Sequence, residues 1–243
     1  MPFTCPRCGA VSHHPKDEEH GYCGRCHEFT GAAPLIIPLG DMTVVGFWPG
    51  KMMKALAVIA AHLHPAYDAS EGALPGNSKE SCLFSSLAVR DFLVAIGFED
   101  ATVRACGLVM RADDPAGTEL HSLGIGVPGD PDRPHKFNGH AVVTVPHLSL
   151  MIDTTLYQAI RPAWGGALTG LVACEYREPA KLKIYDRHPF AGWDVDLEDR
   201  TYKIIWLDRP ELNWKRQPDF AVKSARRRAV TRVLVEAFGV WSE

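Results

Sequence analysis

Residues 77–98 read NSKESCLFSSLAVRDFLVAIGF, and this stretch predicts the central helix of the main domain. Asn77 and Glu80 have the spacing of a capping box at the helix start, and Gly97 is a typical helix end. The apolar residues between these limits recur at helical spacing: Leu83, Phe84, Leu87, Ala88, Phe92, Leu93 and Ile96. We therefore expect a buried helix that carries a cysteine, Cys82, in its first turn.

The elements on both sides of this helix predict the fold class. Residues 50–64 have helical spacing and end before Pro65, which indicates another buried helix. After the central helix, seven short runs have strand character: 102–111, 122–127, 139–145, 148–154, 168–176, 181–185 and 202–207. A last helix over about 219–238 closes the chain. Helices followed by antiparallel strands and a further helix are typical of an α+β fold.

Composition indicates a globular protein of average polarity, because 46% of the 243 residues are hydrophobic and 23% are charged. This length predicts one main domain with a small appendage. The formal net charge of −3 excludes a global positive field that would collect nucleic acid or anionic lipid. No apolar run reaches the roughly 20 residues of a membrane span and no signal segment opens the sequence, so we expect a cytoplasmic protein without membrane contact.

Four cysteines near the N-terminus form two C-x2-C pairs that are separated by 14 residues: Cys5, Cys8, Cys23 and Cys26. Such pairs can supply four thiolates to one Zn²⁺ ion in a closed tetrahedral shell, at about 2.3 Å. The residues between the pairs are mostly polar, so metal binding must supply the folding energy, on the order of 10 kcal/mol. We predict a structural zinc ribbon over residues 1–30 and a main domain over 31–243. Residues 31–41, rich in proline and glycine, are expected to link them.

Other uses of these cysteines compete with the zinc ribbon. Residues 23–27 spell C-x-x-C-H, the haem-attachment motif, but haem attachment occurs outside the cytosol and leaves Cys5 and Cys8 unexplained. A histidine in place of one cysteine is an alternative ligand. A catalytic zinc is disfavoured because a shell of four thiolates leaves no open position for water.

Cys82 is the candidate nucleophile. At a helix N-terminus, unpaired N–H groups and the positive end of the helix dipole stabilise a thiolate. The alternative interpretation is a small buried residue, and we favour that alternative for Cys106 and Cys174, which lie inside predicted strands.

A predicted hairpin supplies partners for this nucleophile. Its two runs, 139–145 and 148–154, flank Pro146 and His147. An even-numbered loop centred there pairs residues whose numbers sum to 293, which sets His140 opposite Asp153 on one face. Pro146 cannot take the positive φ of a type I′ turn, so we expect a four-residue loop. An imidazole base and an orienting carboxylate are what a cysteine nucleophile needs.

The remaining histidines are weaker candidates for the base. His121 and His135 have no carboxylate in ladder register with them. His62 and His64 fall in the last turn of the predicted 50–64 helix, where imidazole suits the helix dipole, and we interpret them as ordinary helix-end residues.

The sequence resembles the transglutaminase-like superfamily of papain-fold cysteine enzymes over about residues 77–160. Three segments carry the resemblance: NSKESCLFSSLAVRDFLVAIGF, NGHAVVTV and LMIDTTLYQ. They match a cysteine that opens a helix, a His-Ala strand start and a terminal Asp-x-Thr. The resemblance implies a papain-like fold in which Cys82 is the nucleophile, His140 the base and acid, and Asp153 the orienting group.

Two features of the resembling segments concern the acyl site. Leu83 and Val142 stand where the family often has aromatic residues. The N–H of Cys82 is one natural oxyanion donor. The side-chain amide of Asn77 is a second oxyanion candidate, with a plain helix cap as its alternative role.

These observations favour a cysteine-dependent acyl-transfer enzyme acting on amide bonds of a protein or peptide, of the protease, deamidase or transglutaminase type. We expect at least one of the loops 113–117 and 128–135 to border the Cys82 site. One alternative is an arylamine-acetyltransferase-like enzyme. Another is a zinc-ribbon protein on an inactive papain-like scaffold that binds protein or nucleic acid. If that protein binds nucleic acid, its phosphate contacts would come from the ribbon and from a basic C-terminal region: Lys215, Arg216, Lys223, Arg226, Arg227, Arg228 and Arg232. The alternative interpretation of this basic region is an ordinary solvated helix face.

Overall fold

The structure is a computed structural model of the chain. It describes residues 3–5, 9–14, 22–23, 25, 28–29, 35–70, 76–129, 137–161, 164, 168–176, 189–212, 214–216 and 224–240. The chain divides into two compact units, Met1–Ile36 and Ile37–Glu243. Among the described residues, no helix is long and apolar enough to cross a membrane.

The first unit contains two short antiparallel hairpins. Strand β1 (Phe3–Thr4) pairs with β2 (Val11–Ser12), and β3 (Tyr22–Cys23) pairs with β4 (Glu28–Phe29). Cys5 directly follows β1, and Cys23 is the last residue of β3. In the first hairpin, the N–H of Cys5 donates to the carbonyl of Ala10 at 2.8 Å, and the N–H of Gly9 donates to the carbonyl of Cys5 at 3.0 Å. Gly9 has φ +69°, a left-handed conformation that suits glycine in so tight a turn.

A nine-stranded sheet forms the frame of the second unit, in the order β12-β13-β7-β9-β10-β11-β6-β5, with β8 paired to β7. Its strands are β5 (Ile36–Leu39), β6 (Met42–Val45), β7 (Thr102–Asp113), β8 (Glu119–Ile125), β9 (His140–Val145), β10 (Leu150–Asp153), β11 (Leu171–Glu175), β12 (Pro189–Asp196) and β13 (Thr201–Asp208). Strand β11 pairs with β6 in parallel, whereas β9, β10 and β13 run antiparallel to their neighbours. The fold is thus α+β, but the expectation of a purely antiparallel sheet was wrong.

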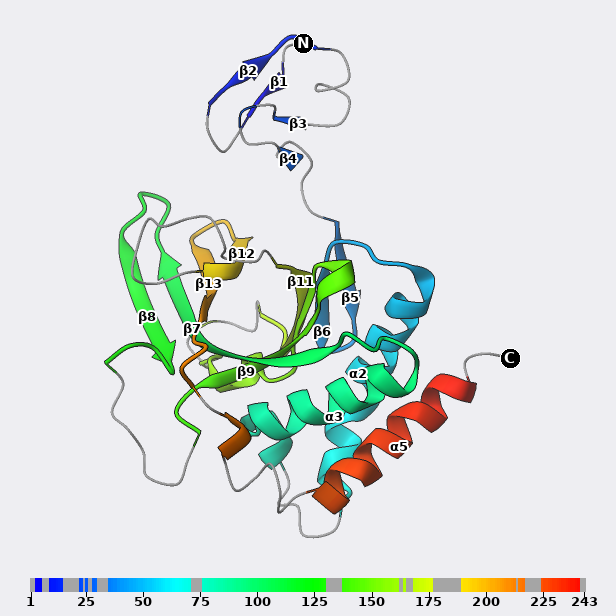
Figure 1. Cartoon of the computed structure of the whole chain (residues 1–243). Coiled ribbons are helices and arrows are strands. Elements are labelled where there is room, and N and C mark those ends of the chain that lie inside the picture. The colour runs from blue at the N-terminus through cyan, green and yellow to red at the C-terminus, as the bar shows by residue number, and fades with distance from the viewer. Residues whose placement is uncertain are drawn as a thin grey trace. The chain divides into compact units, whose positions relative to one another are not determined.

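Three helices pack together on one face of this sheet: α2 (Gly50–Asp68), α3 (Cys82–Ala95) and α5 (Ser224–Val240) (Figure 1). Their apolar faces and the sheet enclose a first core that includes Leu56, Ile59, Phe92, Val143, Ile152 and Leu234. Alternate residues of the same strands face the other way and form a second core, because the sheet curls and brings β12 and β13 over its far face. That core includes Val142, Met151, Trp193, Tyr202 and Trp206.

Several element boundaries differ from the predictions. Helix α2 continues past Pro65 to Asp68, since proline removes only one N–H donor and the added turn buries Tyr67. Residues 31–41 are not only a linker, because Ile36–Leu39 forms the edge strand β5. Strand β12 was not predicted, and the predicted strand at 181–185 lies outside the described residues. The last helix, predicted over 219–238, is described from Ser224 to Val240.

The start of the central helix also differs. Asn77–Glu80 forms a separate 3-10 turn, η1, and Ser81 leaves helical geometry with φ −108° and ψ 61°. Helix α3 therefore begins at Cys82, with Ser81 as its N-cap residue. Neither η1 nor α3 has a side-chain capping hydrogen bond, so the capping box of Asn77 and Glu80 was wrong.

Candidate active site

Cys82 is the first residue of helix α3. The break at Ser81 produces this position, because it separates η1 from the helix and leaves the first amides of α3 without intrahelical acceptors. The cysteine is 7% exposed and packs with Leu83, Leu87, Val103 and Ala141, and Phe137 and Trp214 lie against this cluster. Its Sγ has a weak contact with the carbonyl oxygen of Gly139 at 3.9 Å. The candidate nucleophile is thus nearly buried at the positive end of a helix.

His140 and Asp153 are joined across the hairpin by a bond of 2.7 Å between Nε2 and Oδ2, and both side chains are fully buried. The pairing register differs from the prediction, because Val145 faces Leu150 and Val143 faces Ile152, so that paired numbers sum to 295. The four-residue loop is confirmed, but it spans residues 146–149 and is centred one residue later than expected. Ser149, at φ 48°, belongs to the loop rather than to the strand.

The shift in register keeps His140 and Asp153 on one face. A shift of the sum by two moves a residue to the next partner on the same side of the sheet, whereas a shift by one would reverse the faces. Asp153 therefore lies diagonally from His140 instead of directly opposite it. Directly opposite His140, on the neighbouring strand β7, is Cys106.

Asp153 accepts three hydrogen bonds. The N–H of Thr155 donates to Oδ1 at 2.9 Å, and the indole N–H of Trp206 donates to Oδ2 at 2.8 Å, in addition to the bond with His140. These donors stabilise a buried carboxylate that would otherwise be costly. Trp206 and Thr155 were not among the predicted site residues. Nothing local in the sequence could have identified Trp206, which lies 53 positions from Asp153.

The electrostatics of His140 favour a protonated imidazole. Burial alone lowers the pKa of His140, but the charge of Asp153 and the hydrogen bond to it outweigh burial, and the neighbouring Cys82 adds to the rise, so the pKa is raised to about 10. Because Nε2 is bound to Asp153, Nδ1 is the nitrogen that remains for Cys82. Nδ1 makes no hydrogen bond by strict geometry within the described part of the chain. The contact between imidazole and thiol is therefore close without being a well-formed bond in this state.

Glycines hold the start of strand β9 in place. Gly126 has φ +65°, and a Cβ there would lie 2.5 Å from the Cα of Gly139. A Cβ on Gly139 would lie 2.5 Å from Cδ1 of Leu212. Arg209 also donates to the carbonyl oxygen of Gly126. The clash at Gly126 is with backbone and cannot be relieved without moving the start of β9, whereas the atoms that a Cβ on Gly139 would meet belong to side chains.

His64 is part of the surroundings of the site, contrary to its interpretation as an ordinary helix-end residue. It is buried, and its Nε2 lies 2.9 Å from the carbonyl oxygen of Thr154. Its ring meets Tyr157 edge-on, with 5.4 Å between centroids. Burial lowers the pKa of His64, and Lys79 acts in the same direction. Sequence reasoning missed this role because helix α2 was expected to end at the same turn.

The other candidates are distributed as follows. Asn77 is exposed on η1, and among the described residues its side chain makes no hydrogen bond. His121 is exposed on β8, and His135 lies outside the described residues. Cys106 and Cys174 are buried as predicted, and burial raises the pKa of both thiols.

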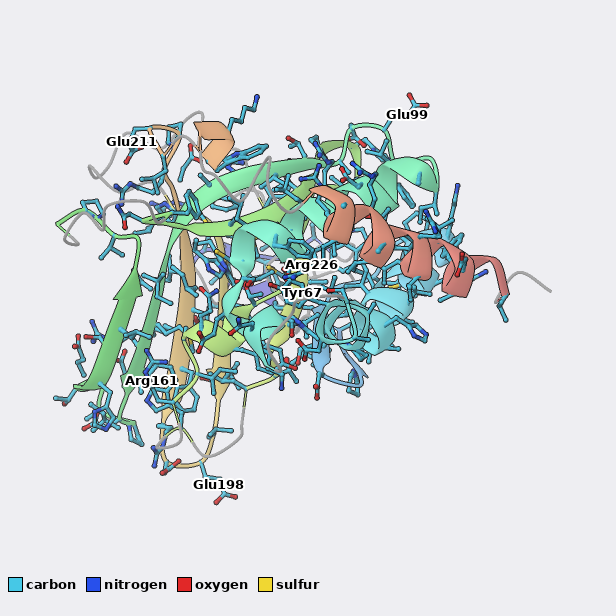
Figure 2. All side chains as sticks on the ribbon, turned by 90° about the horizontal axis from the view of Figure 1, so that it is seen from below. Tyr67, Glu99, Arg161, Glu198, Glu211 and Arg226 are labelled. Atoms are coloured by element: carbon cyan, nitrogen blue, oxygen red, sulfur yellow. The ribbon has the colours of Figure 1, made fainter. Side chains whose placement is uncertain are left out.

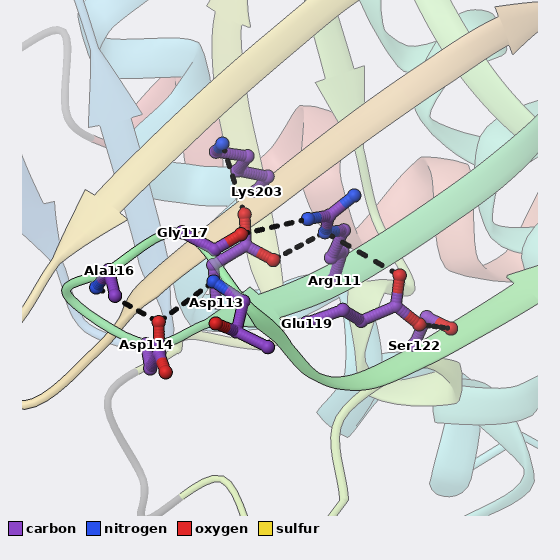
Figure 3. A network of polar contacts seen from close by, with 9 residues as sticks. Arg111, Asp113, Asp114, Ala116, Gly117, Glu119, Ser122 and Lys203 are labelled. Atoms are coloured by element: carbon purple, nitrogen blue, oxygen red, sulfur yellow. Dashed lines mark hydrogen bonds and ion pairs between the residues drawn. The ribbon is translucent and has the colours of Figure 1, made fainter.

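The loop at 113–117 does not border Cys82. It forms the turn between β7 and β8, where Asp114 caps the N–H groups of Ala116 and Thr118 (Figure 3). Asp113 is held there by Arg111 and by Lys203 at 3.1 Å. This turn lies seven residues along β7 from Cys106, or about 24 Å at 3.4 Å per residue. Most of the second loop, 128–135, lies outside the described residues.

Some of the basic residues of helix α5 make contacts within the fold. Arg227 donates to Asp91 at 2.9 Å, and the guanidinium of Arg226 lies 5.8 Å from the ring centre of Tyr67 (Figure 2). Arg228 and Arg232 are exposed. The helix therefore offers fewer cations to a polyanion than the sequence suggested.

Two of the four predicted zinc ligands can be placed. Cys5 and Cys23 are both buried, at 1% and 2% exposure, whereas Cys8 and Cys26 lie outside the described residues. Within the residues that are described, no group of three or more potential metal ligands occurs. Comparison with protein-family models, curated proteins and solved structures gives no match to this chain.

Proposed function

We propose that this protein is a cysteine-dependent acyl-transfer enzyme that acts on amide bonds of a protein or peptide. The observation that carries the proposal is the buried bond between His140 and Asp153, with Nδ1 of His140 left for a cysteine at a helix N-terminus. A buried ionisable pair with a strongly raised pKa is a common mark of a functional site, and this pair lies beside Cys82, which is 7% exposed, whereas Cys106, opposite His140 on β7, is fully buried.

The geometry supports the following steps. The Cys82 sulfur, having passed its proton to Nδ1 of His140, attacks the amide carbonyl carbon, and free N–H groups of the first turn of α3 stabilise the oxyanion. Protonated His140 then gives its proton to the leaving nitrogen, which releases ammonia or an amine and leaves a thioester on Cys82. Water or an acceptor amine, deprotonated by His140, attacks the thioester and frees the thiol. Asp153 keeps the imidazole oriented throughout.

The arrangement of the main unit supports a transglutaminase-like, papain-type assignment. A cysteine opens a helix that packs on a sheet, and the histidine and aspartate lie on adjacent strands of that sheet. Hydrolysis and transfer to an amine share all steps up to the thioester. Protease, deamidase and transglutaminase activities are therefore variants of one proposal, separated by the acceptor.

We further propose that Cys5, Cys8, Cys23 and Cys26 hold one structural Zn²⁺ ion, in a cytoplasmic protein whose thiols stay reduced. The donor chemistry fits, because Cys5 and Cys23 are buried thiols in an assembly of two-residue strands with little apolar content. Bound zinc would supply folding energy and no reaction step. Such a module would serve contacts with protein or nucleic acid.

An electrophilic amide probe tests the catalytic proposal. Incubation with the probe should leave one acyl group on Cys82 by peptide mass mapping, and Cys82→Ala or His140→Ala should abolish it. Cys174→Ala is the matched control, since Cys174 is a buried thiol on β11 that the mechanism does not use. Labelling that persists in Cys82→Ala and stays fast in His140→Ala would refute the proposal.

A further inference from the structure

Trp206 connects two distant strands through one hydrogen bond. It belongs to β13, and Asp153 ends β10, with β7 and β9 between them in the sheet. Strands three places apart in a flat sheet are about 14 Å apart, which is farther than an indole can reach. The curl of the sheet closes this distance, so that Nε1 of Trp206 lies 2.8 Å from Oδ2 of Asp153.

The indole N–H of Trp206 donates to the same oxygen of Asp153 that binds His140. Oδ2 of Asp153 receives both the indole N–H and Nε2 of His140, at 2.8 and 2.7 Å, while Oδ1 receives the N–H of Thr155. All of these side chains are fully buried. An indole N–H only donates, so it cannot take the proton from His140 or compete as a base. It can only fix where the carboxylate points and draw charge from Oδ2.

A second tryptophan in the same core shows that the contact is specific. Trp193 lies in the same apolar cluster and is also buried, but its Nε1 has no hydrogen-bond partner in the described part of the chain. Packing in this core therefore does not by itself provide an acceptor for an indole N–H. The acceptor that Trp206 reaches is the one carboxylate next to His140.

We propose that Trp206 is a positioning residue of the Cys82 site: its indole N–H locks the Asp153 carboxylate in the rotamer that presents Nδ1 of His140 to Cys82. The inference rests on the proposed function for its catalytic consequence, but not for its effect on His140 and Cys82 themselves. Without the N–H, the carboxylate can turn about its side-chain bonds, and the imidazole loses its fixed orientation.

The test compares Trp206→Phe with Trp193→Phe in the full zinc-loaded chain. Trp206→Phe should lower the iodoacetamide alkylation rate of Cys82, and kcat with an amide substrate, by about 10–100-fold while KM changes little. It should also shift the NMR titration of His140, because the loss of a donor changes the charge and the orientation that the Asp153 carboxylate presents to the imidazole. Trp193→Phe should leave all these quantities near wild type.

A second variant separates the loss of the N–H from the loss of packing. Replacement of Trp206 by benzothienylalanine keeps the shape of the ring system and removes only the N–H, so it should reproduce the effects of Trp206→Phe. Unchanged alkylation and an unchanged His140 titration in the benzothienyl protein would overturn the inference, whatever happens to the melting temperature. If wild type transfers no acyl group but these two readouts still shift, the proposed function fails and the positioning role stands.

Discussion

The imidazole of His64 lies 2.9 Å from the carbonyl oxygen of Thr154, the residue that directly follows Asp153. A carbonyl only accepts, so Nε2 carries the proton, and Nδ1 has no partner in the described part of the chain. Helix α2 is thereby connected to the segment that holds the Asp153 carboxylate. Because His64 is buried, the stability of the fold should depend on pH in the acid range.

Stability should fall below about pH 6.5 because of His64. Burial lowers the pKa of His64 below its usual 6.5, Lys79 adds to this, and Asp68 and Asp41 oppose it only in part. As the pH falls below 6.5, His64 becomes protonated in the unfolded chain while it stays neutral in the folded chain. The free energy of unfolding therefore decreases. His64→Gln keeps an N–H donor without the charge, and should flatten this acid slope.

Urea unfolding at several pH values, followed by tryptophan fluorescence, measures the slope. All six tryptophans belong to the unit Ile37–Glu243, so the signal reports that unit alone. His62→Gln, on the same helix, is the control and should retain the slope. An equal slope in His64→Gln and wild type would assign the acid sensitivity to other groups.

The pH dependence of acyl transfer should reveal the pair of His140 and Asp153. Protonated His140 is needed to protonate the leaving nitrogen, and its pKa is raised to about 10, so kcat should decline only as the pH rises through that region. Asp153→Asn removes the charge that raises this pKa. The alkaline decline should then move to lower pH, and kcat at neutral pH should fall by several orders of magnitude.

The same linkage predicts a stability change. The folded-state pKa of His140 lies above the unfolded value of 6.5, so its contribution is complete below about pH 6.5 and is lost as the pH rises to about 10. In Asp153→Asn this alkaline loss should be smaller. A variant with an unchanged pH profile and unchanged alkaline stability would show that the pair does not set the charge on His140.

Alkylation should distinguish the three cysteines of the main unit. Cys82 is 7% exposed at a helix N-terminus beside an imidazole, whereas Cys106 and Cys174 are almost fully buried with raised pKa values. In the folded, zinc-loaded protein, iodoacetamide at neutral pH should modify Cys82 at least about 100-fold faster than the other two. Peptide mass mapping over time measures the three rates, and comparable rates would count against an activated Cys82.

Gly126, which packs against the residue before His140, provides a steric test. Gly126→Ala places a side chain at φ +65° and within 2.5 Å of the Gly139 backbone. The conformation costs about 1–2 kcal/mol, and the overlap adds about 1–3 kcal/mol and displaces the start of β9. Gly117→Ala is the matched control, since it has φ +83° but nothing within 4 Å. Only Gly126→Ala should slow the alkylation of Cys82.

The placement of His140 and Asp153 on one face was predictable because it depends on local periodicity, whereas the approach of Cys82 to this pair was expected from the family resemblance. Alternation along two strands and an even-numbered loop put His140 and Asp153 on one face, and the two-residue error in the pairing partner did not change the face. The start of α3 was predicted four residues too early, with Asn77 instead of Ser81 as the N-cap, but Cys82 still lies in the first turn of the helix.

The remaining parts of the site depend on contacts that no local pattern encodes. Trp206 reaches Asp153 only because the sheet curls around the second core. His64 becomes part of the site only because helix α2 passes Pro65, where tertiary burial outweighs the loss of one hydrogen bond. The parallel pair β6–β11 joins segments more than 120 residues apart, and their short apolar runs carry no sign of the partner.

The last prediction concerns the proposed zinc ion and separates the unit Met1–Ile36 from the unit Ile37–Glu243. One zinc ion per chain is expected by metal analysis, and Cys5→Ser should remove it. The hairpins β1–β2 and β3–β4 are two residues per strand and have little to bury, so loss of zinc should unfold them and expose their thiols. The main unit has its own two cores, so its tryptophan fluorescence and the alkylation rate of Cys82 should stay unchanged.

Chelation of zinc in the wild-type chain should have the same effects as Cys5→Ser: the thiols of the first unit become exposed, and the alkylation rate of Cys82 stays unchanged. If Cys82 loses its reactivity together with the metal, the ion contributes to the active site and the division into a structural and a catalytic unit is wrong.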